Sequence, residues 1–212
     1  MTNIDIHPFW GKKSPLAHVS YIPFLLCASV RLSVAIMSSA ALMWTYVLSR
    51  VTILITARII PATFKSIMHV FISSFWTLVF SVFIYLFSPV LFYEIQFPLA
   101  FTAIIFTFSS LGENVEIQSF SIAMKNAVVE ALIVSFCILI FSLFREPFGF
   151  GALSLPTREG ISEILTSNIA HDLAIRSVAA TSGGLILLGF IVGFYRIAKD
   201  MFITYYSQRE NK

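Results

Sequence analysis

Apolar stretches long enough to cross a bilayer recur along almost the whole of this 212-residue chain. A helix that crosses the hydrocarbon core needs about 20 apolar residues. The stretches lie approximately at Pro15–Val30, Leu32–Ile60, Ser66–Phe87, Val90–Leu111, Asn126–Phe144 and Ser177–Phe194. The sequence therefore predicts an all-α integral membrane protein with about six transmembrane helices.

Composition excludes the main alternative classes. The chain is 58% apolar and 12% charged, whereas soluble domains have about 45–50% apolar and about 25% charged residues. A disordered chain is therefore excluded, and a water-soluble domain is not expected. The net charge of +3 comes from scattered residues and makes no phosphate-binding stripe, so we expect a lipid bilayer and no nucleic acid as partner.

Basic residues predict the orientation. With the N-terminus inside, only four of the 14 Lys and Arg residues fall outside, namely Arg31, Arg145, Arg158 and Arg176. Cytoplasmic loops carry the excess of basic residues, so both termini are expected in the cytoplasm. The predicted domains are a cytoplasmic segment 1–14, a single six-helix transmembrane domain 15–204 and a cytoplasmic tail 205–212.

The longest connection, 147–176, is expected on the outer side. Its residues Ile161, Ile164, Leu165 and Leu173 follow an approximately helical spacing, which predicts a short helix in the membrane interface or a lid on a neighbour.

Two prolines interrupt predicted spans, Pro23 in the first and Pro98 in the fourth, while Ser88-Pro89 separates the third stretch from the fourth. Proline-interrupted segments in corresponding halves of a membrane chain indicate broken helices and an inverted-repeat architecture. Prolines are also common as simple kinks in membrane helices. We predict that the first and fourth helices are broken, with kinks as the alternative.

No soluble-enzyme signature and no metal-ligand spacing occurs, so the chain is expected to catalyse nothing alone and to hold no metal. Cys27 and Cys137 lie in apolar segments, where free cysteines act as small hydrophobes unless they share a metal. Glu94 and Glu130 are the best candidates for an intramembrane ion relay, because a charge in lipid costs roughly 3 kcal/mol. Snorkelling to the interface is the alternative.

Glycines mark one face of the sixth stretch: Gly183, Gly184, Gly189 and Gly193. Such faces allow helices to pack closely in lipid. We expect them to hold the chain's own bundle together, with a subunit interface as the alternative.

The stretch FREPFGFGALSLP, residues 144–156, resembles an Arg-Glu-x-x-Gly-x-Gly-x-Leu signature of a family of membrane proteins. The family comprises the E-type membrane component of the Rnf complex and the D-type membrane component of the sodium-translocating NADH:quinone oxidoreductase (Nqr). Four further stretches resemble other helices of the family. The stretch SPLAHVSYIPFLLCASVRLSVAIMSSAAL resembles the broken first helix together with the second, and ATFKSIMHV resembles the start of the third. The stretches LFYEIQFPLAFTAIIF and SVAATSGGLILLGFIVGFYRI resemble the fourth and the sixth helix. The resemblance covers nearly the whole chain.

The resemblance implies that the chain pairs with a paralogous subunit of inverted topology. In the family the pair holds a 2Fe-2S cluster at the midplane, and each partner contributes one cysteine from its first helix and one from its fourth. Ile22 and Ile104 occupy those positions here, and isoleucine cannot bind iron. We therefore expect the family's fold without a conventional cluster; the cofactor stays unknown.

The resemblance thus implies a membrane subunit of an Rnf/Nqr-type ion-translocating electron-transport complex. Of its signature, Arg145 and Glu146 are expected to act structurally at a helix end, with Gly149 and Gly151 shaping the turn that follows. The alternatives are a small-solute or cation transporter subunit on the same scaffold, or a purely structural scaffold.

Overall fold

The computed structural model describes residues 21–56, 61, 64–111, 120–166 and 176–210. Its elements are α1 (Tyr21–Ala28), α2 (Leu32–Thr56), α3 (Lys65–Phe87), α4 (Pro89–Leu111), α5 (Phe120–Phe150), β1 (Ala152–Thr157), β2 (Gly160–Thr166), α7 (Arg176–Ala179) and α8 (Thr181–Glu210). Among the described residues, five helices are long and apolar enough to cross a membrane, namely α2, α3, α4, α5 and α8. The prediction of a mainly helical chain with several membrane-length helices is confirmed.

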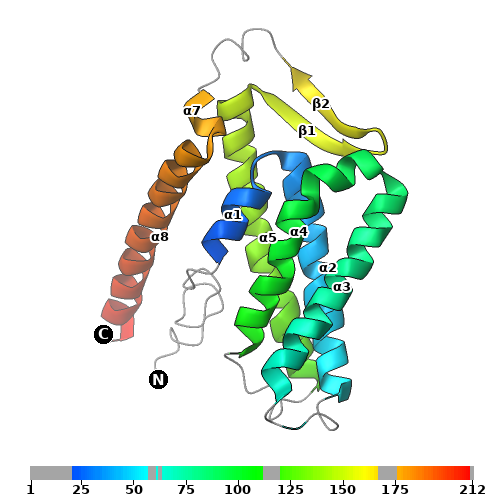
Figure 1. The fold of residues 1–212 in the computed structure, drawn as a ribbon. Coiled ribbons are helices and arrows are strands. Elements are labelled where there is room, and N and C mark those ends of the chain that lie inside the picture. Colours follow the sequence, from blue (N-terminus) through cyan, green and yellow to red (C-terminus); the bar gives the residue numbers. More distant parts are fainter. Residues whose placement is uncertain (1–20, 57–60, 62–63, 112–119, 167–175, 211–212) are drawn as a thin grey trace.

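Helix α2 lies at the centre of the bundle and packs against α3, α4 and α5 (Figure 1). The strands β1 and β2 form an antiparallel hairpin across one end of the bundle, which we call the hairpin end. Helix α8 stands at the side and contacts the rest chiefly through α7 and α1.

Hydroxyl side chains tie α2, α3 and α4 together inside the bundle. The Thr77 hydroxyl of α3 lies 3.3 Å from that of Thr45 on α2 and 3.3 Å from that of Thr102 on α4. The Trp76 indole donates a hydrogen bond of 2.9 Å to Thr52 of α2. In a bilayer, where lipid is as apolar as a leucine side chain, such contacts help to hold helices together.

Large apolar side chains cover the outside of the described helices. On α3, for example, Phe71 and Leu78 are exposed by 67% and 62%. Contiguous apolar surface of this kind is rare on soluble monomers. Since hydrocarbon solvates such side chains, their exposure fits a chain embedded in lipid.

The break predicted at Ser88-Pro89 separates α3 from α4. Helix α3 ends at Phe87, and the Ser88 hydroxyl accepts a hydrogen bond of 3.2 Å from the backbone N–H of Leu91. Ser88 therefore caps α4, and Pro89 occupies its first turn, where no backbone donor is needed. The two helices consequently form a tight antiparallel pair.

The first predicted crossing is described only from Tyr21 onward. This part holds α1, which ends at Ala28. The chain reverses at residues 29–31 and enters α2 (Figure 1). The predicted break at Pro23 is not observed, because α1 is continuous through Pro23. Residues 15–20 lie outside the described residues, as does the predicted cytoplasmic segment 1–14.

The predicted break in the fourth helix is wrong. Helix α4 continues from Pro89 to Leu111 with Pro98 inside it. Proline removes one backbone hydrogen bond, whereas a full break in lipid would leave several backbone groups without partners. The inverted-repeat architecture stays a prediction.

In the described part of the connection 147–176 the predicted interfacial helix is also wrong, because residues 152–166 form the hairpin. Leu173 lies outside the described residues. Arg158 and Glu159 make the hairpin loop, and Gly160 follows with a φ of 121°. Ser154 fixes the hairpin on the bundle, since its hydroxyl donates to that of Ser33 in α2 at 3.1 Å. Four apolar residues at helical spacing are a weak signal, and pairing with β1 outweighs it.

Two helices extend past the predicted spans. Helix α5 covers 31 residues instead of the predicted 126–144. Helix α8 continues to Glu210, so most of the predicted tail 205–212 is helical.

Candidate functional site

The carboxyl group of Glu130 on α5 is the best candidate for a functional group inside the bundle. The hydroxyls of Tyr21 in α1 and Ser109 in α4 each donate a hydrogen bond of 2.5 Å to its Oε1 atom. The Tyr46 hydroxyl of α2 lies 3.2 Å from that of Tyr21. Four helices thus meet around a single carboxyl group.

Packing fixes this arrangement. Tyr21 and Tyr46 are 3% and 0% exposed. The Tyr46 ring stands edge-on to Phe106 with 5.1 Å between centroids, a favourable aromatic geometry. The guanidinium of Arg50, also buried, lies 5.8 Å from the centre of the same Phe106 ring.

The Glu130 site can hold a charge or a proton inside a membrane. Hydrogen bonds from hydroxyl groups stabilise a carboxylate, and such bonds to charged groups are short. The Glu130 side chain is half-buried. Protonation would remove the charge at the same position. Ionisable groups in membrane spans usually mark ion or proton pathways.

Glu94, the other acid of the predicted relay, lies elsewhere. It is exposed on α4, five residues after Pro89 and near the hairpin end. Ser109, which contacts Glu130, lies about 22 Å further along the same helix at 1.5 Å per residue. The structure therefore does not bring Glu94 and Glu130 together.

Arg145, near the end of α5, joins the ends of two other helices. Its Nη1 atom donates to the Leu26 carbonyl at 2.9 Å and to the Ser29 hydroxyl at 3.3 Å, both at the end of α1. Its Nε and Nη2 atoms donate to the carbonyls of Val178 at 3.3 Å and Ala179 at 3.0 Å, in α7. The last carbonyls of a helix have no partner within the helix, so one guanidinium satisfies two helix ends.

Glu146 has the complementary role at the start of α2. Its Oε2 atom accepts a hydrogen bond of 2.8 Å from the backbone N–H of Leu32, the first residue of that helix. A negative charge at a helix N-terminus is favourable. Arg145 and Glu146 are 1% and 2% exposed, so adjacent residues of α5 hold both sides of the α1–α2 reversal.

Glycines allow α5, α7 and α8 to approach one another at this junction. A Cβ atom on Gly149 would lie 2.9 Å from the Ala179 nitrogen, and one on Gly184 would lie 2.9 Å from the Arg145 guanidinium carbon. Gly151 has a φ of 66° just after the end of α5, a conformation that glycine adopts without strain.

Gly183 and Gly189 give a matched test of this packing. We expect Gly183→Ala to destabilise the chain by about 1–3 kcal/mol through overpacking, because the new methyl would overlap the Ser177 carbonyl oxygen. Gly189→Ala is expected to be neutral or slightly stabilising, since no described atom lies within 4 Å of its position. Thermal unfolding in mild detergent measures both variants, and equal midpoints would contradict the expectation.

The two cysteines and the two positions of the family's cluster ligands lie on α1, α4 and α5. Cys27 in α1 and Cys137 in α5 are free and half-buried. Ile22 is half-buried in α1, whereas Ile104 is 46% exposed on α4. In the part of the chain that the structure describes, no group of three or more His, Cys, Asp or Glu side chains could hold a metal ion.

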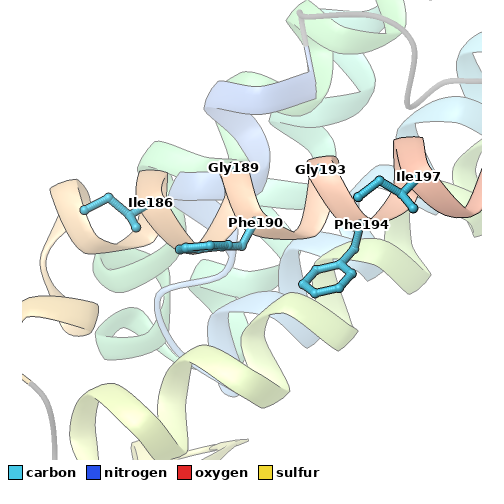
Figure 2. A pocket seen from close by; sticks show the side chains of 6 residues that line it. All are labelled: Ile186, Gly189, Phe190, Gly193, Phe194 and Ile197. Carbon is cyan, nitrogen blue, oxygen red and sulfur yellow. The ribbon is translucent and has the colours of Figure 1, made fainter.

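An open apolar groove of about 480 Å³ lies along α8 (Figure 2). Its lining residues are Ile186, Gly189, Phe190, Gly193, Phe194 and Ile197. Gly183 and Gly184 pack against the chain's own bundle, whereas no described atom lies within 4 Å of a Cβ built on Gly189 or Gly193. The groove offers no hydrogen-bonding side chain, so we assign it no chemistry.

Sequence reasoning singled out Glu130, Arg145 and Glu146 but missed Tyr21 and Ser109. A tyrosine or a serine in an apolar segment gives no signal of its own. Only the fold shows that both contact Glu130.

Comparisons with known proteins find no match to the chain among family models, curated proteins or solved structures.

Proposed function

We propose that the chain is a membrane-spanning subunit of an Rnf/Nqr-type ion-translocating electron-transport complex in a bacterial inner membrane. The observation that supports the ion-translocating role is the Glu130 carboxyl group, which accepts hydrogen bonds from hydroxyl groups on two other helices. The sequence resemblance selects the type of complex. Its signature residues Arg145 and Glu146 are the ones that hold the α1–α2 reversal.

In this proposal the chain forms half of a translocation unit with a paralogous subunit of inverted topology, and other Rnf/Nqr-type subunits carry the electrons. It has no catalytic activity alone. Because Ile22 and Ile104 replace the cluster cysteines, the chain supplies no conventional ligands to a 2Fe-2S cluster.

We further propose that both termini are cytoplasmic and that the hairpin end faces outward. Lys65 begins α3 and Lys125 is the sixth residue of α5, both at the opposite end of the bundle. Arg31 and Arg158 lie at the hairpin end. The positive-inside rule assigns the first group to the cytoplasm.

Purification of the tagged chain from its native host in mild detergent tests the proposal. Mass spectrometry of the eluate is expected to identify an inverted membrane subunit together with flavin- and iron–sulfur-bearing subunits. A visible spectrum of the same sample is expected to show their chromophores. A colourless chain that elutes alone would overturn the redox assignment.

A cation or small-solute transporter subunit on the same scaffold is the second candidate. The absence of the family's cluster cysteines favours this candidate. The Glu130 carboxyl group could bind a cation without any redox partner. Co-purification with an ATPase or a solute-binding protein would support this second candidate and exclude the first.

A further inference from the structure

The Tyr46 hydroxyl group lies behind the Glu130 site, inside the bundle. Tyr46 of α2 is 0% exposed, and its hydroxyl oxygen lies 3.2 Å from that of Tyr21 in α1. The Tyr21 hydroxyl donates to the Oε1 atom of Glu130 at 2.5 Å. A phenol has a single hydroxyl proton to donate, and that of Tyr21 is already used. Between the two tyrosines, Tyr46 is therefore the donor and Tyr21 the acceptor.

The hydrogen bonds of these side chains consequently all lead toward the carboxyl group. Tyr46 donates to Tyr21, Tyr21 donates to Glu130, and Ser109 of α4 donates to the same Oε1 atom at 2.5 Å. A hydroxyl group that accepts one hydrogen bond becomes a better donor in the next, because chains of hydrogen bonds polarise one another. Tyr46 thus strengthens the bond from Tyr21 to Glu130 without contacting the carboxyl group itself.

The two oxygen atoms of the Glu130 carboxyl group differ in their surroundings. Oε1 accepts two hydrogen bonds, whereas Oε2 accepts none from the described residues. The side chain is half-buried, so part of its surface stays accessible. A carboxylate offers about four acceptor positions on its two oxygens. Oε2 therefore keeps its lone pairs for a proton or a metal cation.

We propose that the Oε2 atom of Glu130 binds and releases the exchanged cation, and that Tyr46, through Tyr21, sets how readily the cation leaves. The inference rests on the proposed ion-translocating function and assigns the affinity of its ion site to named groups. Hydrogen bonds from Tyr21 and Ser109 to Oε1 favour the free carboxylate, so a cation on Oε2 is held less tightly. Tyr46 is a positioning residue, because it acts through Tyr21.

This arrangement matches the requirement of a carboxyl group that must give its ion away again. A charge inside a membrane is costly, so the carboxylate gains a cation easily, and its release is the difficult step because release restores the charge. Hydroxyl groups that favour the charged form make this step easier. Loss of these hydroxyl groups should therefore tighten ion binding, whereas damage to a binding site would weaken it.

Carbodiimide labelling of the full chain in membranes tests the inference without requiring the complex. The probe is N,N′-dicyclohexylcarbodiimide, an apolar reagent that adds to protonated carboxyl groups. Mass spectrometry of the peptide that contains Glu130 follows its addition. The variants are Tyr21→Phe, Ser109→Ala and Tyr46→Phe, and Glu130→Gln gives the background.

The variants remove hydroxyl groups and leave the packing in place. Phenylalanine keeps the ring of each tyrosine, including the ring that stands edge-on to Phe106 in the case of Tyr46. Tyr85→Phe is the matched control, because Tyr85 lies exposed on α3 and its replacement should leave the labelling rate unchanged.

We expect Tyr21→Phe and Ser109→Ala to label about tenfold faster than the parent chain, because each loses a hydrogen bond to a charged group. Tyr46→Phe is expected to label about twofold faster, since it only weakens the bond that Tyr21 donates. Labelling at the parent rate in Tyr46→Phe would overturn its positioning role. Parent rates in the other two variants would overturn the inference as a whole, even if co-purification supports the subunit proposal.

Ion uptake separates the role of Tyr46 from a purely structural one. Vesicles that hold the native assembly provide the assay, with a pH-sensitive dye for protons and radioactive sodium for the metal ion. In Tyr46→Phe we expect a lower KM for the transported ion together with a lower kcat, because the ion binds more tightly and leaves more slowly. A raised KM would indicate damage to the site and would overturn the positioning role.

Discussion

Arg145→Met is expected to prevent the chain from accumulating in a folded form. Methionine fills a similar volume, but it cannot donate to the Leu26 and Ala179 carbonyls, which Arg145 contacts at 2.9 and 3.0 Å. Both carbonyls lose a charged donor, and a hydrogen bond to a charged group contributes about 1.5–3 kcal/mol, so the loss of two costs about 3–6 kcal/mol. Total stability is typically about 5–15 kcal/mol. Size-exclusion chromatography in mild detergent and the midpoint of thermal unfolding measure the loss.

Arg158→Met is the matched control for this variant. Arg158 lies exposed in the loop of the hairpin, so its replacement should leave elution and unfolding unchanged. Arg145→Lys is expected to fall between the two, because a single ammonium group cannot reach the two helix ends that the planar guanidinium joins. An Arg145→Met chain that elutes and unfolds like the parent would contradict the structural role of the residue.

Glu130→Gln is expected to abolish ion transport while the chain stays folded. Glutamine keeps the shape and an oxygen that accepts from Tyr21 and Ser109, but it cannot bind and release a proton. Loss of a positioned proton-transfer group typically lowers a rate by about 10²- to 10⁴-fold. Membrane vesicles that hold the native assembly provide the assay, with a pH-sensitive dye for protons and radioactive sodium for the metal ion.

Glu159→Gln serves as the control for transport, since Glu159 is exposed in the hairpin loop away from the bundle interior. Its transport rate should equal that of the parent chain. Transport that persists in Glu130→Gln at the parent rate would exclude Glu130 from the ion path.

Hydrophobic length predicted the membrane-length helices well, but it could not locate the reversal that follows α1. Tyr21–Ala28 is as apolar as the longer helices, and the reversal after it depends on Arg145 and Glu146, more than 100 residues later. Pro98 illustrates a similar limit. Proline predicts a break from local chemistry, whereas the need to satisfy backbone groups in lipid keeps α4 continuous.

The candidate site was predictable only in part. A carboxyl group in an apolar span stands out by its charge, so Glu130 could be found from sequence. Glu94 carried the same signal but lies exposed near the end of α4. The partners of Glu130 could not be found, because which helices meet depends on tertiary packing and not on local spacing.

The hydrogen bonds of Arg145 have a consequence for biosynthesis. They join the end of α1 to a residue 119 positions later, and that residue in turn to α7, 33 and 34 positions further on. The ribosome must therefore complete most of the chain before the first helix acquires its lasting partners. Until then the Leu26 carbonyl lacks its hydrogen bond from Arg145. A message truncated before codon 145 would yield a product whose first helix never docks, which makes it a natural substrate for membrane proteases.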